Sequence, residues 1–259
     1  MKRTLISQQH IAQTVSGVSP EEIDAHFNLL PDRYFAQTDE SEVALHLGMV
    51  NRLLHNISGA DSLGSLRPVI EWRDAPDHSH SVVHVVTWDR SGLFHRLAGA
   101  LSVAGLNILS AKITTRNDHI AIDSFEVDAA GPEFESARAT FARTVEEALV
   151  ANRDLAPAIA AQSSLHPGGG AAHAPTVDVY LEINSPRAIV EMHVPDRFGL
   201  LYRVGRVIAE AGFSLTSARV HTERGLAIDR FHLDAADGKP VDAARLQALR
   251  EALLIASIR

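Results

Sequence analysis

One short motif occurs twice in this chain, and its residue types suit the binding of an amino acid. The first copy runs from Asp89 to Leu93 (D-R-S-G-L) and the second from Asp196 to Leu200 (D-R-F-G-L). Apolar residues at helical spacing follow each copy, so a helix should begin at the motif. The free backbone N–H groups of a helix start attract a carboxylate, and an Asp accepts a hydrogen bond from an α-ammonium group. Each motif is therefore a candidate site for a small amino acid.

The same residues also have a structural explanation. Asp89 and Asp196 could cap the helix starts through a side-chain oxygen, while Gly92 and Gly199 could serve only a tight turn. The nearby arginines are most simply solvated charges or partners of Asp123 and Asp229; they are Arg90, Arg96, Arg197 and Arg203. Both explanations stay open from the sequence.

The strand that follows each helix opens with a further polar candidate, Asn107 in the first copy and Ser214 in the second. Asn107 could hydrogen-bond the backbone or side-chain amide of a ligand, although it could equally be a turn residue after Gly105. The full set of candidate ligand-binding residues is Asp89, Arg90, Gly92, Leu93, Phe94, Asn107, Ile108, Asp196, Arg197, Gly199, Leu200, Leu201, Ser214 and Leu215.

The two motifs belong to a longer internal repeat. Residues 87–110 align without a gap with residues 194–217, 107 positions later. Both helices then meet a glycine, Gly105 or Gly212, where a left-handed C-terminal cap needs a residue without a Cβ. Each copy therefore contains the same strand, turn and helix.

The elements around each repeat predict an α+β fold. Strands are expected at 67–72, 81–88, 108–115 and 120–127, and again at 177–183, 188–194, 215–222 and 226–233, with a closing helix after each set. This order describes two ferredoxin-like units of the βαββαβ type, with antiparallel sheets and helices on one face. Each unit has an extra leading strand in place of a trailing one.

The rest of the chain divides into a helical segment and a linker. Residues 1–66 lack the repeat and are expected to be helical, with Ser19 as an N-cap and Glu22 at the capping-box position. The Ala- and Gly-rich residues 156–175 predict a flexible linker, because their triple glycine has no phosphate-loop context. The expected domains are therefore 1–66, 67–155 and 176–259, with the linker between the last two.

Composition limits the classes of protein to which the chain can belong. The 259 residues carry a formal net charge of -8 and no basic run, which argues against nucleic-acid binding. The absence of cysteine excludes disulfides and thiolate nucleophiles. No apolar signal-peptide core or membrane-spanning stretch is present. We expect a cytoplasmic protein that binds neither nucleic acid nor membrane.

Enzyme chemistry finds little support in the residue pattern. No serine is framed as G-x-S-x-G. Of the 14 histidines, seven come into question as metal ligands but have no helical spacing to carboxylates that they all share; they are His10, His26, His46, His55, His78, His80 and His84. His78 and His80 would need a third metal ligand, which the sequence does not supply. We expect no catalytic residue, no cofactor and no metal site.

Three parts of the repeat resemble the ACT domain, a small βαββαβ module that senses ligands. They are the D-R-x-G-L motif with its helix, the Ala-Gly pair ending that helix, and the sequence A-I-D-x-F at 121–125 and 227–231. More narrowly, the tandem copies look like the carboxy-terminal half of the bacterial PII uridylyltransferase/uridylyl-removing enzyme. Residues 29–35 and 38–46 are similar to the helical segment before the ACT pair of that enzyme. The resemblance covers about residue 19 to the end.

The resemblance implies a regulatory protein that binds an amino acid, with glutamine as the first candidate because the resembling enzyme senses it. In ACT-like proteins the ligand occupies the motif loop against the second strand of a neighbouring domain, and paired sheets imply a homodimer. The nucleotidyltransferase and His-Asp hydrolase motifs of that enzyme are missing from this sequence, so we expect no catalysis. Ser91 and Phe198 replace a proline that often follows D-R in the family, which leaves both loops less rigid.

Two other functions stay open. The repeat could serve only dimerisation or docking to a regulatory partner protein, or it could control a separately encoded uridylyltransferase. A ligand-dependent shift in melting would favour the amino-acid sensor, whereas concentration-dependent assembly without such a shift would favour the interaction module.

Overall fold

The computed structural model describes residues 8–59, 67–75, 79–128, 133–163, 174–183 and 185–258. Its helices are α1 (Gln8–Thr14), α2 (Pro20–Leu29), α3 (Asp32–Gln37), α4 (Glu40–Gly59), α5 (Leu93–Val103), α6 (Phe134–Leu149), α7 (Ala156–Ser163), α8 (Leu200–Glu210) and α9 (Ala243–Ile258). Its strands are β1 (Val69–Asp74), β2 (His80–Trp88), β3 (Ile108–Thr115), β4 (Ile120–Asp128), β5 (Thr176–Leu181), β6 (Ala188–Pro195), β7 (Phe213–Arg219), β8 (Thr222–Glu223) and β9 (Leu226–Ala235).

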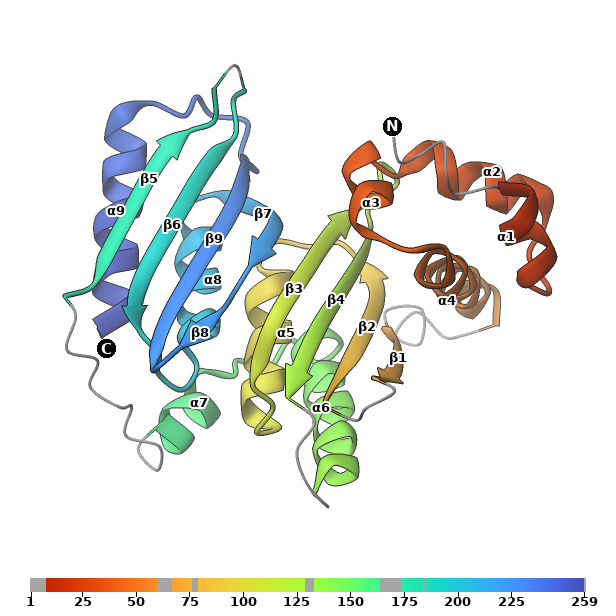
Figure 1. The fold of residues 1–259 in the computed structure, drawn as a ribbon, viewed down its shortest axis with the longest axis horizontal. Coiled ribbons are helices and arrows are strands. Elements are labelled where there is room, and N and C mark those ends of the chain that lie inside the picture. The colour runs from red at the N-terminus through yellow and green to blue at the C-terminus, as the bar shows by residue number, and fades with distance from the viewer. Residues whose placement is uncertain are drawn as a thin grey trace. The chain divides into compact units, whose positions relative to one another are not determined.

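The expected α+β fold of two ferredoxin-like units is confirmed. The strands follow the order β1-β2-β4-β3-β7-β9-β6-β5, with β8 beside β9 (Figure 1). The extra leading strand of the second copy is β5, which pairs antiparallel with β6 from Thr176 to Leu181.

The chain forms two compact units, each assembled from several segments. Unit 1 contains Met1–Trp72, Val83–Asp89 and Thr114–Ser124, and unit 2 contains Arg73–Val82, Arg90–Ile113 and Phe125–Arg259. Strands β2, β3 and β4 therefore contribute residues to both units.

Unit 1 has a core built from the amino-terminal helices and three strand residues. The capping box at the start of α2 is present as expected, because Ser19 Oγ accepts from the Glu22 backbone N–H and the Ser19 N–H donates to the Glu22 carboxylate. The core gathers the apolar stripes of α2 and α4 with buried aromatic residues of α3; its largest buried side chains include Tyr34, Phe35, Leu47 and Leu53.

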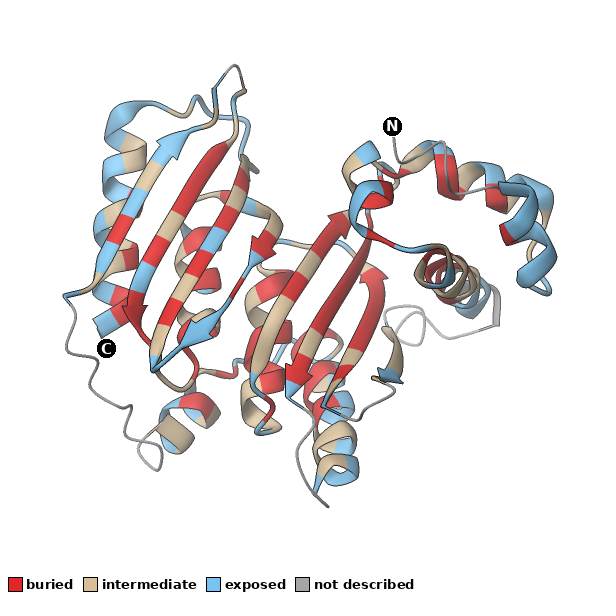
Figure 2. Cartoon of the chain, viewed as in Figure 1, coloured by how far each residue is buried: buried red, intermediate tan, exposed pale blue. Residues whose placement is uncertain are grey.

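Unit 2 contains the carboxy-terminal half of the sheet and its covering helices. Helices α8 and α9 lie on one face of β7, β9, β6 and β5 (Figure 1). Buried and more exposed residues alternate along β9, as expected for a strand with one covered face (Figure 2). The buried positions include Ala227, Asp229, Phe231 and Leu233, so one carboxylate shares the core-facing side of the strand.

The two copies of the repeat meet within unit 2. Strands β3 and β7 pair antiparallel, with Ala111 opposite Ala218. Helices α5 and α8 approach closely at glycines: a Cβ on Gly99 would lie 2.7 Å from Tyr202 Cδ2, and one on Gly205 would lie 2.6 Å from Phe94 Cδ1. The close approach of these helices therefore depends on residues without side chains.

One sequence-based expectation differs from the structure. The segment 156–175 was expected to be a flexible linker, yet its first residues form α7. Ala-rich segments favour helix, and this helix buries Ile159 and is joined to α5 by the Gln162 side chain, which donates to the Val103 carbonyl. The triple glycine at 168–170 lies outside the described residues.

No helix in the described parts of the chain is long and apolar enough to span a membrane.

Candidate functional site

The motif of the second copy forms the turn between β6 and α8. Gly199 is the N-cap of α8 and has a φ of 70°, a left-handed conformation that strains residues with a Cβ. A Cβ at this position would also lie 2.6 Å from Ile159 Cγ2. The carboxylate of Asp196 does not cap the helix, because its hydrogen bond is to Thr222 Oγ1 at 3.2 Å. Asp196 is thus held at the side of the turn, near β8.

A cavity of about 370 Å³ opens beside this turn. Its size lies within the range of small-molecule sites, roughly 300–1,000 Å³. Seven of the predicted residues line it: Asn107, Ile108, Asp196, Arg197, Gly199, Leu200 and Leu201. The turn of the second copy therefore faces the start of β3 in the first copy, which is the arrangement that the ACT resemblance implies.

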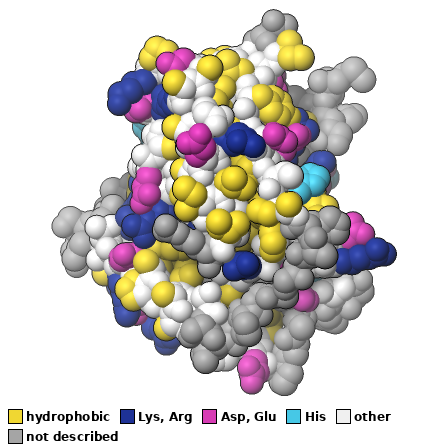
Figure 3. Space-filling model, turned by 90° about the vertical axis from the view of Figure 1, so that its left-hand side faces the viewer, with side chains coloured by type: hydrophobic (Ala, Val, Ile, Leu, Met, Phe, Trp, Pro, Cys, Tyr) yellow, Lys and Arg dark blue, Asp and Glu magenta, His cyan; other side chains and the backbone are white. Residues whose placement is uncertain are grey.

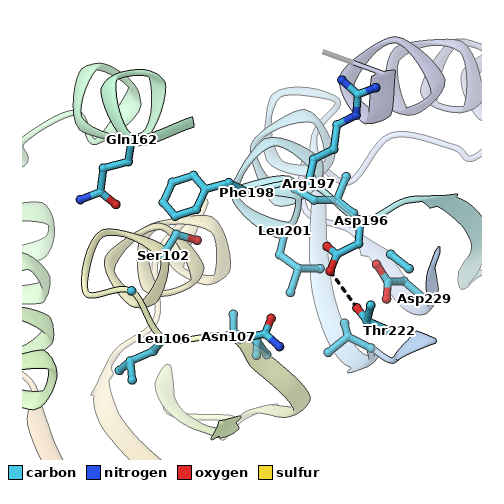
Figure 4. Close-up of a pocket in the computed structure, with 16 residues that line it drawn as sticks. Ser102, Leu106, Asn107, Gln162, Asp196, Arg197, Phe198, Leu201, Thr222 and Asp229 are labelled. Carbon is cyan, nitrogen blue, oxygen red and sulfur yellow. Dashed lines mark hydrogen bonds between the residues drawn. The ribbon is translucent and has the colours of Figure 1, made fainter. Parts of the chain in front are cut away.

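The cavity also has lining residues that the sequence did not single out as ligand-binding. They are Ser102, Gly105, Leu106, Gln162, Phe198, Val220, Thr222, Ala227 and Asp229. Figure 4 shows Asp196, Thr222 and Asp229 together at one end, with Phe198 and Ser102 toward the other. The cavity thus combines an acidic end with an apolar wall.

Asp229 is the most informative of these additional residues. Its side chain is buried, with 4% of the residue exposed, and its Oδ1 accepts from the backbone N–H of His221 at 3.3 Å. Its Oδ2 has no hydrogen-bond partner among the described residues. Burial raises the pKa of Asp229 to about 7; the His221 N–H opposes this rise, and the negative charge of Asp196 adds to it.

The sequence contained a signal that Asp229 is buried. The A-I-D-x-F motif and a pairing with an arginine already accounted for this residue at the level of sequence, and the signal was missed. In a strand with period-two alternation, Asp229 falls in phase with Phe231 and Leu233, which are core residues. A carboxylate among core positions indicates a site with a specific partner.

The arginines near the motifs do not pair with the buried aspartates as the structural explanation suggested. Arg203 donates through Nε to the Ala256 carbonyl and through Nη1 to the Phe198 carbonyl. Arg96 and Arg90 donate to the carbonyls of Ala148 and Leu149. The carbonyls of Ala256, Ala148 and Leu149 belong to the last turns of α9 and α6, where carbonyl groups lack partners within the helix and carry the negative end of its dipole, whereas Phe198 lies in the motif turn.

Unlike Asn107 and Ile108, the predicted residues at the motif of the first copy have other surroundings. Leu93 and Phe94 are buried in the core, where the Phe94 ring lies 6.2 Å from Phe125 and 6.3 Å from Phe231. Gly92 lines a different cavity, of about 390 Å³, with His95 and Tyr202. Ser214 and Leu215 lie on β7 and are not among the described residues that line the 370 Å³ cavity.

The first copy nevertheless repeats the carboxylate pair. Asp123 of β4 is 1% exposed, and its oxygens lack a hydrogen bond of good geometry among the described residues, although the nearby Thr114 backbone N–H lowers the pKa of the carboxyl. Burial raises the pKa of Asp123 well above its usual value, and the negative charge of Asp89 adds to the rise. Asp89 and Asp123 thus stand in the same electrostatic relation as Asp196 and Asp229.

A buried histidine pair in unit 1 was not foreseen. His46 Nε2 lies 2.9 Å from His84 Nδ1. Two hydroxyl groups extend the pair: Tyr34 Oη lies 2.8 Å from His46 Nδ1, and Ser124 Oγ lies 2.9 Å from His84 Nδ1. Sequence spacing could not find this chain, because its members come from α3, α4, β2 and β4. In the described residues, no group of three or more His, Cys, Asp or Glu side chains could hold a metal ion.

Residues 188–251 match the family model for the ACT domain. This range contains β6, α8, β7 and β9, and so includes Asp196 and Asp229. The fold on which the cavity is built is therefore an ACT fold in the second half of the chain.

The curated relatives are bifunctional uridylyltransferase/uridylyl-removing enzymes, which the chain matches in their carboxy-terminal region. It is 30% identical over 259 residues to the enzyme of Rhodospirillum rubrum, with 97% of this chain and 27% of that protein covered. It is 34% identical over 233 residues to the enzyme of Phenylobacterium zucineum, with 88% and 24% covered. The chain spans about a quarter of the length of these relatives.

Among solved structures, the chain matches the aspartate kinase from Synechocystis with a TM-score of 0.42, 17% identity and coverage of 70% of this chain and 28% of that one. A putative glycine cleavage system transcriptional repressor has a TM-score of 0.23 and 20% identity, covering 68% of this chain and 91% of that one.

Proposed function

We propose that this chain is a non-catalytic regulatory module that binds a small amino acid at the cavity between the Asp196 turn and the start of β3. One observation supports the proposal above all others: residues chosen from both copies of the repeat line a single cavity. The functional units are the two ACT-like segments 67–155 and 176–259, joined by 156–175.

The chemistry of the cavity matches the two charged groups of an amino acid. Backbone N–H groups at the start of α8 favour the α-carboxylate, and the Asp196 carboxylate accepts from the α-ammonium. Asn107 offers an amide that can both donate and accept, which suits an amide side chain. Glutamine is the first candidate, because the resemblance to uridylyltransferases implies it.

Binding at this place would couple the two copies. The ligand would contact the α8 turn of one copy and β3 of the other, so it would bind most tightly to the arrangement in which these elements meet. A ligand shifts a conformational equilibrium only through such a difference in affinity. The signal would therefore be a change in the arrangement of the two ACT-like units.

Thermal melting against the twenty amino acids tests this function. At about 10 mM ligand, a dissociation constant near 0.1 mM corresponds to roughly 2.7 kcal/mol of stabilisation, enough for a clear upward shift in Tm. Asp196→Ala and Asn107→Ala should each reduce the shift, while Asp178→Asn on the exposed face of β5 should preserve it. A flat response of the unaltered protein to all twenty would count against amino-acid sensing.

A specific surface favours a second function, assembly with another protein chain. Strand β5 lies at the end of the sheet order. The exposed large apolar side chains in the described residues are Tyr180, Leu181, Ile183, Ile255 and Ile258, on or just after β5 and on α9. Apolar side chains gather on this side of the protein (Figure 3). An open strand edge with apolar neighbours is suited to pairing with a second copy or a partner protein.

Sedimentation velocity over a hundredfold concentration range tests the assembly function. Ile183, which is 88% exposed, can be replaced by Glu without disturbing a core. A homodimer formed at β5 should dissociate in this variant, and the neighbouring control Glu182→Gln, at a half-buried position, should remain dimeric. A concentration-independent monomer would leave only a partner protein, such as a separately encoded uridylyltransferase, as the occupant of this edge.

A further inference from the structure

The strongest unexplained feature of the cavity is the free oxygen of Asp229. A buried polar atom without a hydrogen bond destabilises the fold by roughly 1–3 kcal/mol, and more when the group is charged. Such atoms are rare in native proteins and often belong to sites completed by another molecule. Asp229 Oδ2 has no partner among the described residues, and the residue lines the cavity.

Among the described residues, no cationic side chain near the cavity bonds the Asp229 carboxylate. Arg203 is engaged by the carbonyls of Ala256 and Phe198. Arg230, the next residue along β9, points to the opposite face of the strand and pairs with Glu191 at 3.5 Å. Arg197 lines the cavity, but its guanidinium extends away from Asp229 (Figure 4).

Two carboxylates therefore stand at one end of the cavity with hydrogen-bonding capacity to spare. Asp196 Oδ2 accepts from Thr222 Oγ1, and Asp229 Oδ1 accepts from the His221 N–H, which leaves one oxygen of each without a protein donor in the described residues. A primary ammonium group has three N–H donors and a positive charge, so it can bond both carboxylates at once. A divalent cation fits less well, because no third acidic or imidazole side chain accompanies the pair in the part of the chain that the structure describes.

We propose that Asp196 and Asp229 together form a subsite for a primary ammonium group, and that Asp229 makes the cavity select ligands that carry one. This inference rests on the proposed function and deepens it: the ligand class is primary amines, and amino acids are the members that also fill the helix start. Asp229 is thus a specificity-determining residue of the binding site.

The recurrence of the pair in the first copy supports a role beyond chance. Asp123 is as deeply buried as Asp229, lacks a hydrogen bond of good geometry for either oxygen among the described residues, and has its pKa raised further by the negative charge of Asp89. A buried aspartate behind the motif aspartate is therefore a property of the repeat.

The subsite makes ligand affinity depend on pH. Below pH 7, the empty cavity holds a proton on Asp229, because burial and Asp196 raise the pKa of this carboxyl to about 7. A bound ammonium group favours the carboxylate and lowers this pKa, so binding below pH 7 releases a proton. Affinity should rise as the pH increases from 6 to 8, by up to about tenfold per unit below 7.

The titratable groups on elements packed against Asp229 are few. Asp196 follows β6, and His221 lies between β7 and β8 with an exposed side chain; only its backbone N–H bonds Asp229. Asp229 lies opposite Met192 on β6. The variant His221→Gln keeps the backbone donor and changes only an exposed side chain, so it is a matched control for Asp229→Asn.

The first experiment compares ligands. Calorimetry is run on the full chain with the amino acid that gives the largest melting shift, with its deaminated analogue and with its N-acetyl derivative. The proposal requires at least tenfold weaker binding of both analogues. Equal binding of the deaminated analogue would overturn it. If the wild-type protein responds to no amino acid, the proposed function is overturned as well. If only Mg²⁺ or Ca²⁺ stabilises the protein, and Asp229→Asn loses this stabilisation, the carboxylate pair binds a metal ion instead.

The second experiment compares variants. Asp229→Asn keeps the shape of the side chain and removes a buried acid, so without ligand it should melt at the same temperature as wild type or higher. This variant should bind the amino acid at least tenfold more weakly. Its binding at pH 6 should release no proton, which is measured by comparing the binding enthalpy in two buffers of different ionisation enthalpy. The control variants Asp178→Asn and His221→Gln should retain the wild-type affinity and the wild-type proton release. If Asp196→Ala abolishes binding while Asp229→Asn leaves affinity and proton release unchanged, the function stands and the subsite is wrong.

Discussion

The rings of His95 and Tyr202 pack edge to face, with centroids 5.6 Å apart and planes at 76°, although the two residues occupy the same position in the two copies of the repeat. Ala111 and Ala218, another equivalent pair, lie opposite each other on β3 and β7. Equivalent residues meet in this way when two copies are related by an approximate two-fold axis. The repeat therefore builds an interface with itself, and the cavity beside the Asp196 turn follows from it.

The closeness of α5 and α8 predicts that Gly205 tolerates no side chain. In Gly205→Ala the added Cβ would lie 2.6 Å from Phe94 Cδ1 and 3.0 Å from His95 Cβ, so the helices must separate. Ala favours the helix by about 1 kcal/mol over Gly, but overpacking costs about 1–3 kcal/mol. We expect a lower Tm by circular dichroism and weaker amino-acid binding, because Asn107 and Asp196 come from the two copies.

Gly48→Ala is the matched control for this substitution. Gly48 is also within a helix, α4, but nothing lies within 4 Å of its added Cβ. This variant should melt at the same temperature as wild type or higher. Equal Tm values for the two variants would show that the α5–α8 contact relaxes without cost.

Arg203 predicts a link between helix capping and the ligand site. Its guanidinium bonds the Ala256 carbonyl at the end of α9 and the Phe198 carbonyl in the motif turn. Arg203→Met keeps the aliphatic volume but removes both bonds, so we expect a loss of about 1–3 kcal/mol of stability and reduced ligand affinity. Arg206→Met is the control, because Arg206 pairs with Glu210 at a largely exposed site and should lose less than about 0.5 kcal/mol. Similar losses in both variants by urea unfolding would contradict the capping role.

The sequence predicted the parts of the fold that depend on local pattern. The helical spacing of Leu200, Val204 and Ile208 marked α8, and all three are buried. The glycines Gly105 and Gly212 have the left-handed φ values, 75° and 77°, that the helix ends required. These features are set by neighbours a few residues away, so a short window of sequence contains their cause.

Features that depend on contacts between distant segments could not be predicted. His46 and His84 are 38 residues apart and meet only because α4 packs on the sheet. Arg203 reaches Ala256 through the docking of α9, where a sequence argument offered Asp229 as a partner. The position of Asp229 at the cavity becomes visible only when the register of β9 with its neighbouring strands is known. In each case the chemistry of the residue was visible, but its neighbour was not.

The row of hydrogen bonds through the histidine pair predicts that the stability of unit 1 depends on the hydroxyl group of Tyr34. Tyr34→Phe removes the hydroxyl that lies 2.8 Å from His46 Nδ1 and leaves a buried ring nitrogen without this partner. We expect a loss of about 1–3 kcal/mol, measured by urea unfolding. Tyr180→Phe, on the exposed β5 strand, should change stability by less than about 0.5 kcal/mol. A silent Tyr34→Phe would mean that the histidine pair finds its hydrogen bonds without the hydroxyl.

Unit 1 should lose stability as the pH falls below the ordinary pKa of histidine. Burial, together with the charge of Arg116, whose Nη1 lies 3.3 Å from His26 Nδ1, lowers the pKa of His26 to about 3. Between this value and the pKa of about 6.5 in the unfolded chain, only the unfolded state binds the proton. The contribution of His26 is therefore complete above pH 6.5 and decreases by roughly 1.4 kcal/mol for each pH unit below it.

Tryptophan fluorescence can isolate this effect, because both tryptophans, Trp72 and Trp88, belong to unit 1. Urea unfolding at pH 7.0 and 5.5 should show a loss of about 1.2 kcal/mol attributable to His26. In His26→Gln this part of the pH dependence should disappear, whatever the variant costs in absolute stability, since only the difference between the two pH values is compared. His55→Gln, which alters an exposed histidine of α4, should retain it. The same pH difference in all three proteins would show that His26 takes up its proton without unfolding unit 1.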